Sequence, residues 1–450
     1  MPIVIVLFGA TGDLVAKRIV PALFHLFRTG KLPTAFRIVG VSRRPISLDE
    51  FREKMKEAIR HRSQVTGHRL QMNGFLKLFS FHQLQFEHED AYLTLAATLD
   101  PAANRLVYLA VPPEQYPTIL ANLARSSIVS KGSRGRSSRI PWSRIIVEKP
   151  FGMDAKHAEA MEKQLAEFVD ESQIYRIDHY LAKDMLQNIL NFRFSNKLFE
   201  DNWNARDIES IHIRLWEKVS VEHRGSLYDR IGALRDVGQN HLLQMLALVT
   251  MDRPASFSAE DVRTKRADIL AALRIPTKTE IRRETSRAQY TGYRSIAGVR
   301  PHSDTETFCK VVAHLATSRW HGVPITMEAG KQMRETRKEI LVQFRSPYRN
   351  SVLFTLEPEE GITIHFWSKK PGLDRDTERR AFDFVLRGAS ERTEAVAEHE
   401  KLLLDAIAGD QTLFVSTDEV RAMWRFIDPI LDGWKKNIVP LAKYDPGVVP

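Results

Sequence analysis

Short apolar runs alternate with segments of helical periodicity in the first third of the chain. Residues 3–8 form a β-branched run that ends at a glycine, which is typical of a buried strand. Residues 14–29 follow with apolar side chains on one side of a predicted helix. Further strands are predicted at 36–41, 105–111 and 144–147, and a further helix at 51–62. This alternation predicts a parallel sheet with crossover helices.

The rest of the chain has a different pattern, without regular helices between its strands. It predicts a large, mainly antiparallel sheet that carries a few helices. We place the boundary near Tyr175, which gives an α/β domain over 1–175 and an α+β domain over 176–450. The predicted strands span 211–216, 307–314, 340–344, 351–356 and 362–367, and the last helices span 398–408 and 417–431.

Composition and charge exclude several classes of protein. The chain has 450 residues, 43% of them hydrophobic and 27% charged, which is ordinary globular usage and excludes a wholly disordered chain. Its net charge of +10 favours anionic partners, either phosphorylated small molecules or nucleic acid. Spread over this length and without a motif, that charge does not support nucleic-acid binding. The single cysteine, Cys309, excludes an internal disulfide framework and a Cys-rich zinc site, and we predict no metal centre.

The apolar run at the N-terminus does not indicate membrane insertion or secretion. Residues 2–8 are too few to span a bilayer, and they lack a basic flank and a small-residue cleavage site. We therefore predict no membrane association and a cytoplasmic location.

A glycine-containing turn follows the first predicted strand and opens the first helix. It consists of Gly9, Ala10, Thr11, Gly12, Asp13 and Leu14. Glycines there permit close approach of a pyrophosphate to the backbone, and the helix N-terminus offers free N–H groups. Two glycines alone are a weak signal, but the flanking strand and helix favour dinucleotide binding.

The end of the second strand indicates which dinucleotide the chain binds. An NAD site usually has an acidic residue there to bind the ribose 2′-hydroxyl, whereas this strand runs into Ser42, Arg43 and Arg44. A guanidinium can bind a 2′-phosphate through two hydrogen bonds, so NADP is favoured. The alternative is that both arginines are ordinary surface charges.

Three longer motifs resemble one enzyme family. They are I-V-E-K-P-F-G at 146–152, R-I-D-H-Y-L-A-K-D at 176–184 and R-D-V-G-Q-N-H-L-L-Q at 235–244. Together with the glycine turn they closely resemble glucose-6-phosphate dehydrogenase, and the likeness continues in order through Trp203, Tyr228, Arg319, Lys331 and Trp424. The resemblance implies a Rossmann domain, an α+β domain and a homodimer or homotetramer. It also implies oxidation of glucose 6-phosphate at C1 to 6-phosphogluconolactone with hydride transfer to NADP, the first step of the oxidative pentose phosphate pathway.

The resemblance also implies roles for individual residues. His241 matches the general base that takes the O1 proton, Asp178 the carboxylate that orients it, and Lys149 a lysine near substrate and nicotinamide. The matching substrate-binding positions are His179, Tyr180 and Lys183 for the 6-phosphate, and Glu217, Asp236 and Lys331. Arg18 and Tyr108 match positions near the cofactor, although strand packing explains Tyr108 equally well.

Spacing gives two geometric expectations. His179 and Lys183 are four apart, so on an α-helix they would share a face. Asp236 and His241 are five apart, about 140° around an ideal α-helix, so they cannot both lie centrally on one face.

The chain departs from the family pattern at several positions. Ala182 replaces the usual glycine and Asp184 the commoner glutamate. The family carries a second basic residue five positions after Lys331, where this chain has Thr336, with Arg337 next. Arg337 is a candidate replacement, although strand alternation would turn it to the opposite face. Thr355 stands where some animal members use arginine, so we predict no second NADP site.

Alternative interpretations remain open at this stage. One is another sugar or sugar-phosphate dehydrogenase, and another is a non-catalytic NADP-sensing protein; His179 and Lys183 oppose an unphosphorylated sugar as substrate. The Ser- and Arg-rich segment 126–139 is either a solvated loop or a contact for a polyanion or a second subunit.

Overall fold

The chain forms two compact units. The structure is a computed structural model that describes residues 1–62, 69–132, 141–345, 347, 349–373, 375–386 and 398–450. Unit 1 comprises Met1–Gly152, Lys156–Ala182 and Val396–Thr417, and unit 2 comprises Met153–Ala155, Lys183–Ala395 and Asp418–Pro450. This division differs from a single cut near Tyr175, because the chain re-enters unit 1 late in the sequence. Half of segment 126–139, from residue 133 on, lies outside the described residues.

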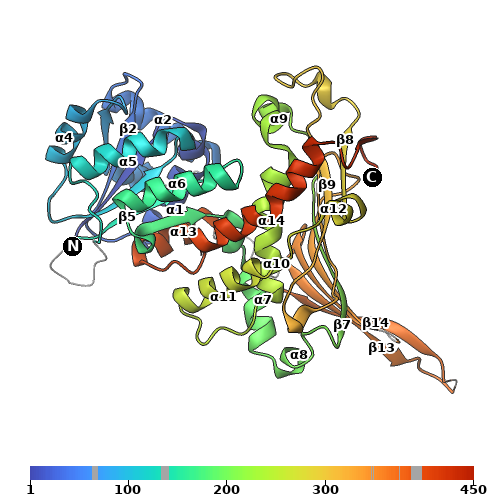
Figure 1. The fold of residues 1–450 in the computed structure, drawn as a ribbon. Helices are drawn as coiled ribbons and strands as arrows, with labels where there is room; N and C mark the ends of the chain where they lie inside the picture. Colours follow the sequence, from blue (N-terminus) through green and yellow to red (C-terminus); the bar gives the residue numbers. More distant parts are fainter. Residues whose placement is uncertain (63–68, 133–140, 346, 348, 374, 387–397) are drawn as a thin grey trace. The chain divides into compact units, whose positions relative to one another are not determined.

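Unit 1 is built on a seven-stranded sheet with the order β15-β6-β5-β4-β1-β2-β3 (Figure 1). All neighbouring strands are parallel except β15, which pairs antiparallel with β6. The strands are β1 (Ile3–Phe8), β2 (Phe36–Ser42), β3 (Phe79–Gln83), β4 (Asn104–Leu109), β5 (Ser143–Val147), β6 (Ile174–Ile177) and β15 (Phe414–Val415). The strand order reverses between β1 and β4, and ligands bind at the carboxyl ends of strands beside such a reversal.

Among the helices of unit 1, α1 packs with α2, α3 and α13, and α4 packs with α5. They are η1 (Val15–Ile19), α1 (Val20–Arg28), α2 (Leu48–Arg62), α3 (Arg69–Leu76), α4 (Glu89–Thr98), α5 (Tyr116–Arg125), α6 (Ala155–Phe168) and α13 (Glu398–Ala408), with short 3-10 turns η2 (Pro113–Gln115), η3 (Glu171–Gln173) and η4 (His179–Ala182). The predicted first helix is confirmed, with a π-helical start at η1, which ends two residues before Pro21, a residue with no N–H to donate.

Unit 2 contains a nine-stranded sheet with the order β14-β13-β12-β11-β7-β10-β9-β8-β16 (Figure 1). It is antiparallel except where β7 pairs with β10 and β8 with β16. The strands are β7 (Ile208–Trp216), β8 (Thr285–Tyr290), β9 (Phe308–Ala313), β10 (Ile325–Gly330), β11 (Arg337–Phe344), β12 (Ser351–Glu357), β13 (Gly361–Lys369), β14 (Thr377–Val385) and β16 (Leu441–Tyr444). Both sheets confirm the predicted fold class.

Helices of unit 2 pack on this sheet, with α7 against β12 and η6 against β7 and β10. They are α7 (Asp184–Phe194), α8 (Lys197–Glu200), α9 (Gly225–Ala233), η6 (Leu234–Leu242), α10 (Leu243–Thr250), α11 (Ala259–Ala271), α12 (Lys278–Glu284) and α14 (Thr417–Lys435), with 3-10 turns η5 (Glu222–Arg224), η7 (Tyr293–Ser295) and η8 (Ser318–Trp320).

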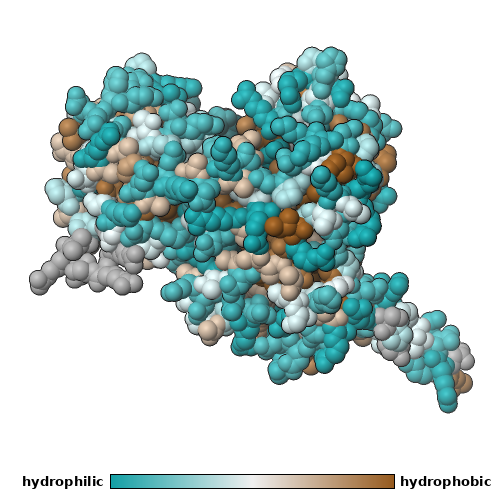
Figure 2. Space-filling model, viewed as in Figure 1, coloured by the Kyte–Doolittle hydropathy of each residue, from teal (hydrophilic) through white to brown (hydrophobic). Residues whose placement is uncertain are grey.

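Hydrophilic side chains cover most of the face shown in Figure 2. Within the described part of the chain, no helix combines the length and the apolar character that a membrane span requires.

Candidate active site

The glycine turn after β1 has a geometry that only glycine adopts without strain. Gly9 has φ +77°, and a Cβ atom there would collide with the carbonyl oxygen of Ala110. The Gly12 N–H donates to the Gly9 carbonyl at 2.9 Å, which closes the turn. Glycine at position 9 therefore lets the turn pack closely against the end of β4, and it places the turn at the carboxyl end of β1, where open α/β sheets bind their ligands.

The end of β2 lies against this turn. The hydroxyls of Thr11 and Ser42 are 2.9 Å apart. Arg43 and Arg44 follow and are exposed, and the Arg43 guanidinium lies 5.1 Å from the centre of the Phe86 ring. In the described part of the chain no carboxylate is paired with either arginine, so both are available to an anion.

Lys149 follows β5 and sits beside a buried carboxyl group. The Tyr108 hydroxyl donates to Glu148 at 2.5 Å, and the Glu148 backbone is hydrogen-bonded to the Tyr116 hydroxyl. Burial raises the pKa of Glu148 above its usual value, although Tyr108 and Lys149 act in the opposite direction. Tyr108 is fully buried, and its hydroxyl holds the carboxyl group of the residue next to Lys149.

Asp178 caps the short turn η4 that carries His179 and Tyr180. Its side chain accepts the Tyr180 N–H at 3.0 Å, and its carbonyl accepts the Leu181 N–H. Only 1% of Asp178 is exposed. The preceding strand is fixed by Arg176, which is paired with two glutamates.

The expectation that His179 and Lys183 share a helix face is wrong. Residues His179–Ala182 form a single 3-10 turn, and Lys183 is extended at φ −67° and ψ 134° before α7 begins at Asp184. Because the backbone between these two residues is not α-helical, their four-residue spacing does not place them on one face.

Asp236 and His241 lie in the π-helix η6 rather than in an α-helix. A π-helix joins residues five apart by its hydrogen bonds, so it brings these two residues to one side of the helix. The separation of 140° expected for an α-helix is therefore wrong. The Asn240 amide donates to the Asp236 carbonyl at 3.1 Å, which spans the same turn. His241 is only 3% exposed.

A buried glutamate fixes the start of this helix. Glu306 accepts the Leu234 N–H on its side chain at 3.0 Å and the Ala233 N–H on its carbonyl at 3.1 Å. Gly232 precedes them with φ 75° and ψ 172°, and a Cβ atom there would collide with the Glu306 carboxylate. The sequence offered no signal for Glu306, which lies far from the helix along the chain.

The carboxylate of Asp236 is held by an arginine that the sequence analysis did not select. Arg224 donates to both oxygens of Asp236, at 3.1 and 2.7 Å. This bidentate pair fixes the orientation of the carboxylate and leaves its outer lone pairs for further donors.

Glu217 and Lys331 form a second pair, at the ends of the neighbouring strands β7 and β10. Lys331 donates to Glu217, and the Glu217 N–H donates to the Gly330 carbonyl at 2.9 Å. Burial acts to raise the pKa of Glu217, but the ammonium groups of Lys331 and Lys338 outweigh it and hold that pKa below its usual value. The carboxylate is therefore charged at neutral pH.

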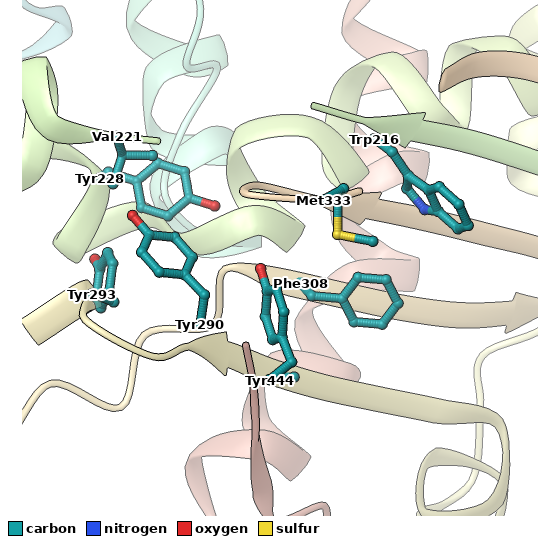
Figure 3. Packing of buried hydrophobic residues seen from close by; sticks show 9 residues of the cluster. Trp216, Val221, Tyr228, Tyr290, Tyr293, Phe308, Met333 and Tyr444 are labelled. Carbon is teal, nitrogen blue, oxygen red and sulfur yellow. The ribbon is translucent and has the colours of Figure 1, made fainter. Parts of the chain in front are cut away.

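An aromatic cluster supports the backbone of Lys331 (Figure 3). The Tyr444 hydroxyl donates to the Lys331 carbonyl at 2.6 Å. The ring of Tyr444 packs edge-on against Phe308 and Tyr290. The last strand of the chain thereby helps to position a predicted substrate residue.

Comparison with known proteins identifies the family. The family model described as the NAD binding domain of glucose-6-phosphate dehydrogenase matches residues 6–188, and the model of the C-terminal domain matches 190–449. The chain belongs to the glucose-6-phosphate dehydrogenase family. It is an oxidoreductase with glucose-6-phosphate 1-dehydrogenase activity and a dinucleotide-binding N-terminal domain.

Relatives of this enzyme match over nearly the whole chain. Glucose-6-phosphate 1-dehydrogenase from Aggregatibacter actinomycetemcomitans is 37% identical over 95% of this chain and 90% of its own. The Bacillus subtilis enzyme is 34% identical over 99% of this chain and 94% of its own. A solved glucose-6-phosphate dehydrogenase in complex with glucose 6-phosphate superposes with a TM-score of 0.89 at 32% identity, covering 99% of this chain and 95% of its own.

Proposed function

We propose that the enzyme uses NADP and that Arg43 contacts the 2′-phosphate. The glycine turn lies at the carboxyl end of β1, where sheets of this kind bind a pyrophosphate, and the Thr11–Ser42 contact brings the end of β2 to that turn. When bound, NADP accepts the hydride from the sugar. Gly9 to Leu14 bind the pyrophosphate through backbone N–H groups, and Arg18 adds an exposed cation after the turn.

We also propose the roles of the sugar-binding residues. His241 takes the proton from O1 while hydride leaves C1, Asp178 orients His241, and Lys149 contacts the substrate. Asp236 and Glu217 accept sugar hydroxyls, because each is held charged and oriented by a cation. His179, Tyr180, Lys183 and Lys331 bind the phosphorylated substrate as donors and cations. The observation that carries this proposal is the π-helical turn that presents Asp236 and His241 on one side of η6.

The test measures NADP reduction by absorbance with glucose 6-phosphate, beside glucose and NAD as controls. A His241→Asn variant keeps a polar side chain at this position and removes the base. We expect turnover to depend on the phosphate and to fall by about 100-fold or more in the variant. Undiminished kcat in the variant would exclude His241 as the base.

We propose assembly into a homodimer or homotetramer through the β13–β14 edge of unit 2. This hairpin extends beyond the rest of its sheet in Figure 1, and it exposes Trp367, Phe382 and Phe384. Exposed aromatic residues on an edge strand favour contact with another chain. Sedimentation of the native enzyme and of a Phe382→Ser/Phe384→Ser variant tests this, because a variant with unchanged mass would place the interface elsewhere.

A cytoplasmic location is proposed as well. Two Arabidopsis thaliana relatives, each 34% identical, carry the word cytoplasmic in their names. Fractionation of the source cells tests this location.

A further inference from the structure

Arg337 and Lys338 follow Thr336 on β11, and the structure shows which of them lies on the same side as Glu217 and Lys331. On β11, Arg337 lies opposite Trp216 and packs its guanidinium 5.6 Å from that ring, on the same face as Glu339. Lys338 therefore points to the other face, with the buried residues Ile340 and Val342. Arg337 is turned away from Glu217 and Lys331, as strand alternation predicts.

A β-bulge brings a carboxylate to Lys338. The pairing of β11 with β12 shifts between Lys338 and Glu339, so that Lys338 lies opposite Glu357 instead of Leu356. Bulges of this kind redirect a side chain. The Lys338 ammonium lies 2.8 Å from one Glu357 oxygen and 3.6 Å from a Glu217 oxygen.

Lys338 thus stands at the centre of a row of alternating charges. Lys183 contacts the other Glu357 oxygen at 3.2 Å, and Lys331 contacts the other Glu217 oxygen. The row contains three ammonium groups and two carboxylates, so it carries one excess positive charge. Lys338 is 9% exposed, and burial of a cation at this point is favourable only with such partners.

We propose that Lys338 is a substrate-binding residue that contacts the phosphate dianion, and that it supplies the cation absent at position 336. Glu357 holds the ammonium groups of Lys183 and Lys338 together before substrate binds. The dianion then takes the place of the Glu357 carboxylate between these two cations, which already lie close enough to share one anion. The inference rests on the proposed phosphate contact of Lys183.

The test compares Lys338→Met with Arg337→Met, its neighbour on the opposite face. Lys338→Met leaves each carboxylate with one lysine, so neither becomes an unpaired buried charge. We expect the KM for glucose 6-phosphate to rise about 10- to 100-fold in Lys338→Met, with kcat little changed and a smaller effect for glucose, which has no phosphate. Arg337→Met changes KM by less than about 3-fold, and Lys338→Arg recovers most of the affinity.

Inorganic phosphate provides a second readout that needs no turnover. We expect its competitive inhibition constant to rise in Lys338→Met and to fall in Glu357→Gln, because the neutral amide competes less for the two ammonium groups. Equal losses with glucose and glucose 6-phosphate would show that Lys338 is only structural. A larger effect of Arg337→Met would assign the cation to Arg337 and overturn the proposal.

A Lys183→Met variant separates the two proposals. If Lys183→Met raises the KM while Lys338→Met does not, the phosphate site is as proposed and Lys338 takes no part in it. If Lys338→Met raises the KM selectively for the phosphorylated sugar but Lys183→Met does not, the assignment of Lys183 is wrong and Lys338 alone is supported. Melting temperatures of all variants exclude unfolding as the cause.

Discussion

Substitution of Gly232 by alanine should damage the helix that carries His241. An alanine at φ 75° and ψ 172° occupies a region that is essentially restricted to glycine, at a cost of about 1–3 kcal/mol. Its Cβ atom would also displace the Glu306 carboxylate, which then loses the Leu234 N–H, at a further cost of about 1–3 kcal/mol. We expect Gly232→Ala to lower the free energy of unfolding by about 2–6 kcal/mol in total.

The same change should reduce activity. Displacement of the first turn of η6 moves the base relative to its substrate, and small misplacements of catalytic groups reduce rates by about 100-fold. Chemical denaturation measures the stability, and NADP reduction measures kcat. A coupled loss of both is expected, because Ala233 and Leu234 connect Gly232 directly to the helix.

Two other glycines provide matched controls. Gly292 has φ +91° and no atom within 4 Å of the position that a Cβ would occupy, so Gly292→Ala tests the backbone cost alone, at about 1–2 kcal/mol. Gly238 lies inside η6, and its Cβ would meet only the flexible end of Leu234, so Gly238→Ala should change stability by less than about 1 kcal/mol.

A double-mutant cycle with Glu306→Ala then isolates the collision. The combined variant should lose less stability than the sum of the two single variants, because the alanine at 232 no longer meets a carboxylate. A collision at position 232 is excluded if Gly232→Ala costs no more stability than Gly292→Ala, or if the costs of Gly232→Ala and Glu306→Ala simply add.

Three further predictions follow from the same structure. Arg43→Ala should raise the KM for NADP by about 10- to 100-fold and leave the KM for NAD nearly unchanged; equal losses in cofactor titrations would remove Arg43 from the 2′-phosphate. Arg176→Met leaves the buried Glu162 without its cation and should cost about 3–5 kcal/mol in denaturant unfolding; a cost below about 1 kcal/mol would show that Arg176 does not hold β6. Burial, and to a smaller extent the negative charge of Asp410, raises the pKa of Asp405 from 3.8 to about 6. Between about pH 4 and 6 the Asp405 carboxyl is ionised in the unfolded chain but protonated in the folded one. Stability should therefore fall as pH rises through this range and stay lower above it. Asp405→Asn should remove this fall and stabilise the enzyme at pH 7 by about 1–2 kcal/mol, after allowance for partial exposure; an unchanged pH profile in thermal melts would assign the titration to another group.

The local patterns of the chain determined much of the fold. The strands and both C-terminal helices expected from hydrophobic periodicity form close to their predicted ranges, because each has a buried side that the pattern displays. Strand β14 was missed, since nearly all its side chains are exposed and its first four residues are polar, so that no buried apolar face marks it. Strand β15 has only two residues and pairs with β6, hundreds of positions earlier in the chain.

The residues of the candidate site also fall into those that the sequence indicates and those that only the fold reveals. The motifs select Gly9, Asp178, His241 and Lys331, since their residue types and neighbours are local properties of the sequence. Arg224, which holds Asp236, Glu306, which holds the start of η6, and Glu357, which contacts Lys183, were not selected, because each reaches its partner through the fold and not through a spacing.

The sequence by itself thus determined the two kinds of sheet, the turn that requires glycine and the side chains that are candidates for the chemistry. The tertiary structure decided how those side chains are presented. A π-helical register brought Asp236 and His241 to one side of η6, and a bulge in β12 turned Glu357 towards Lys338. Both depend on hydrogen bonds whose register is set by packing against neighbouring strands and helices, and a linear sequence does not display that register.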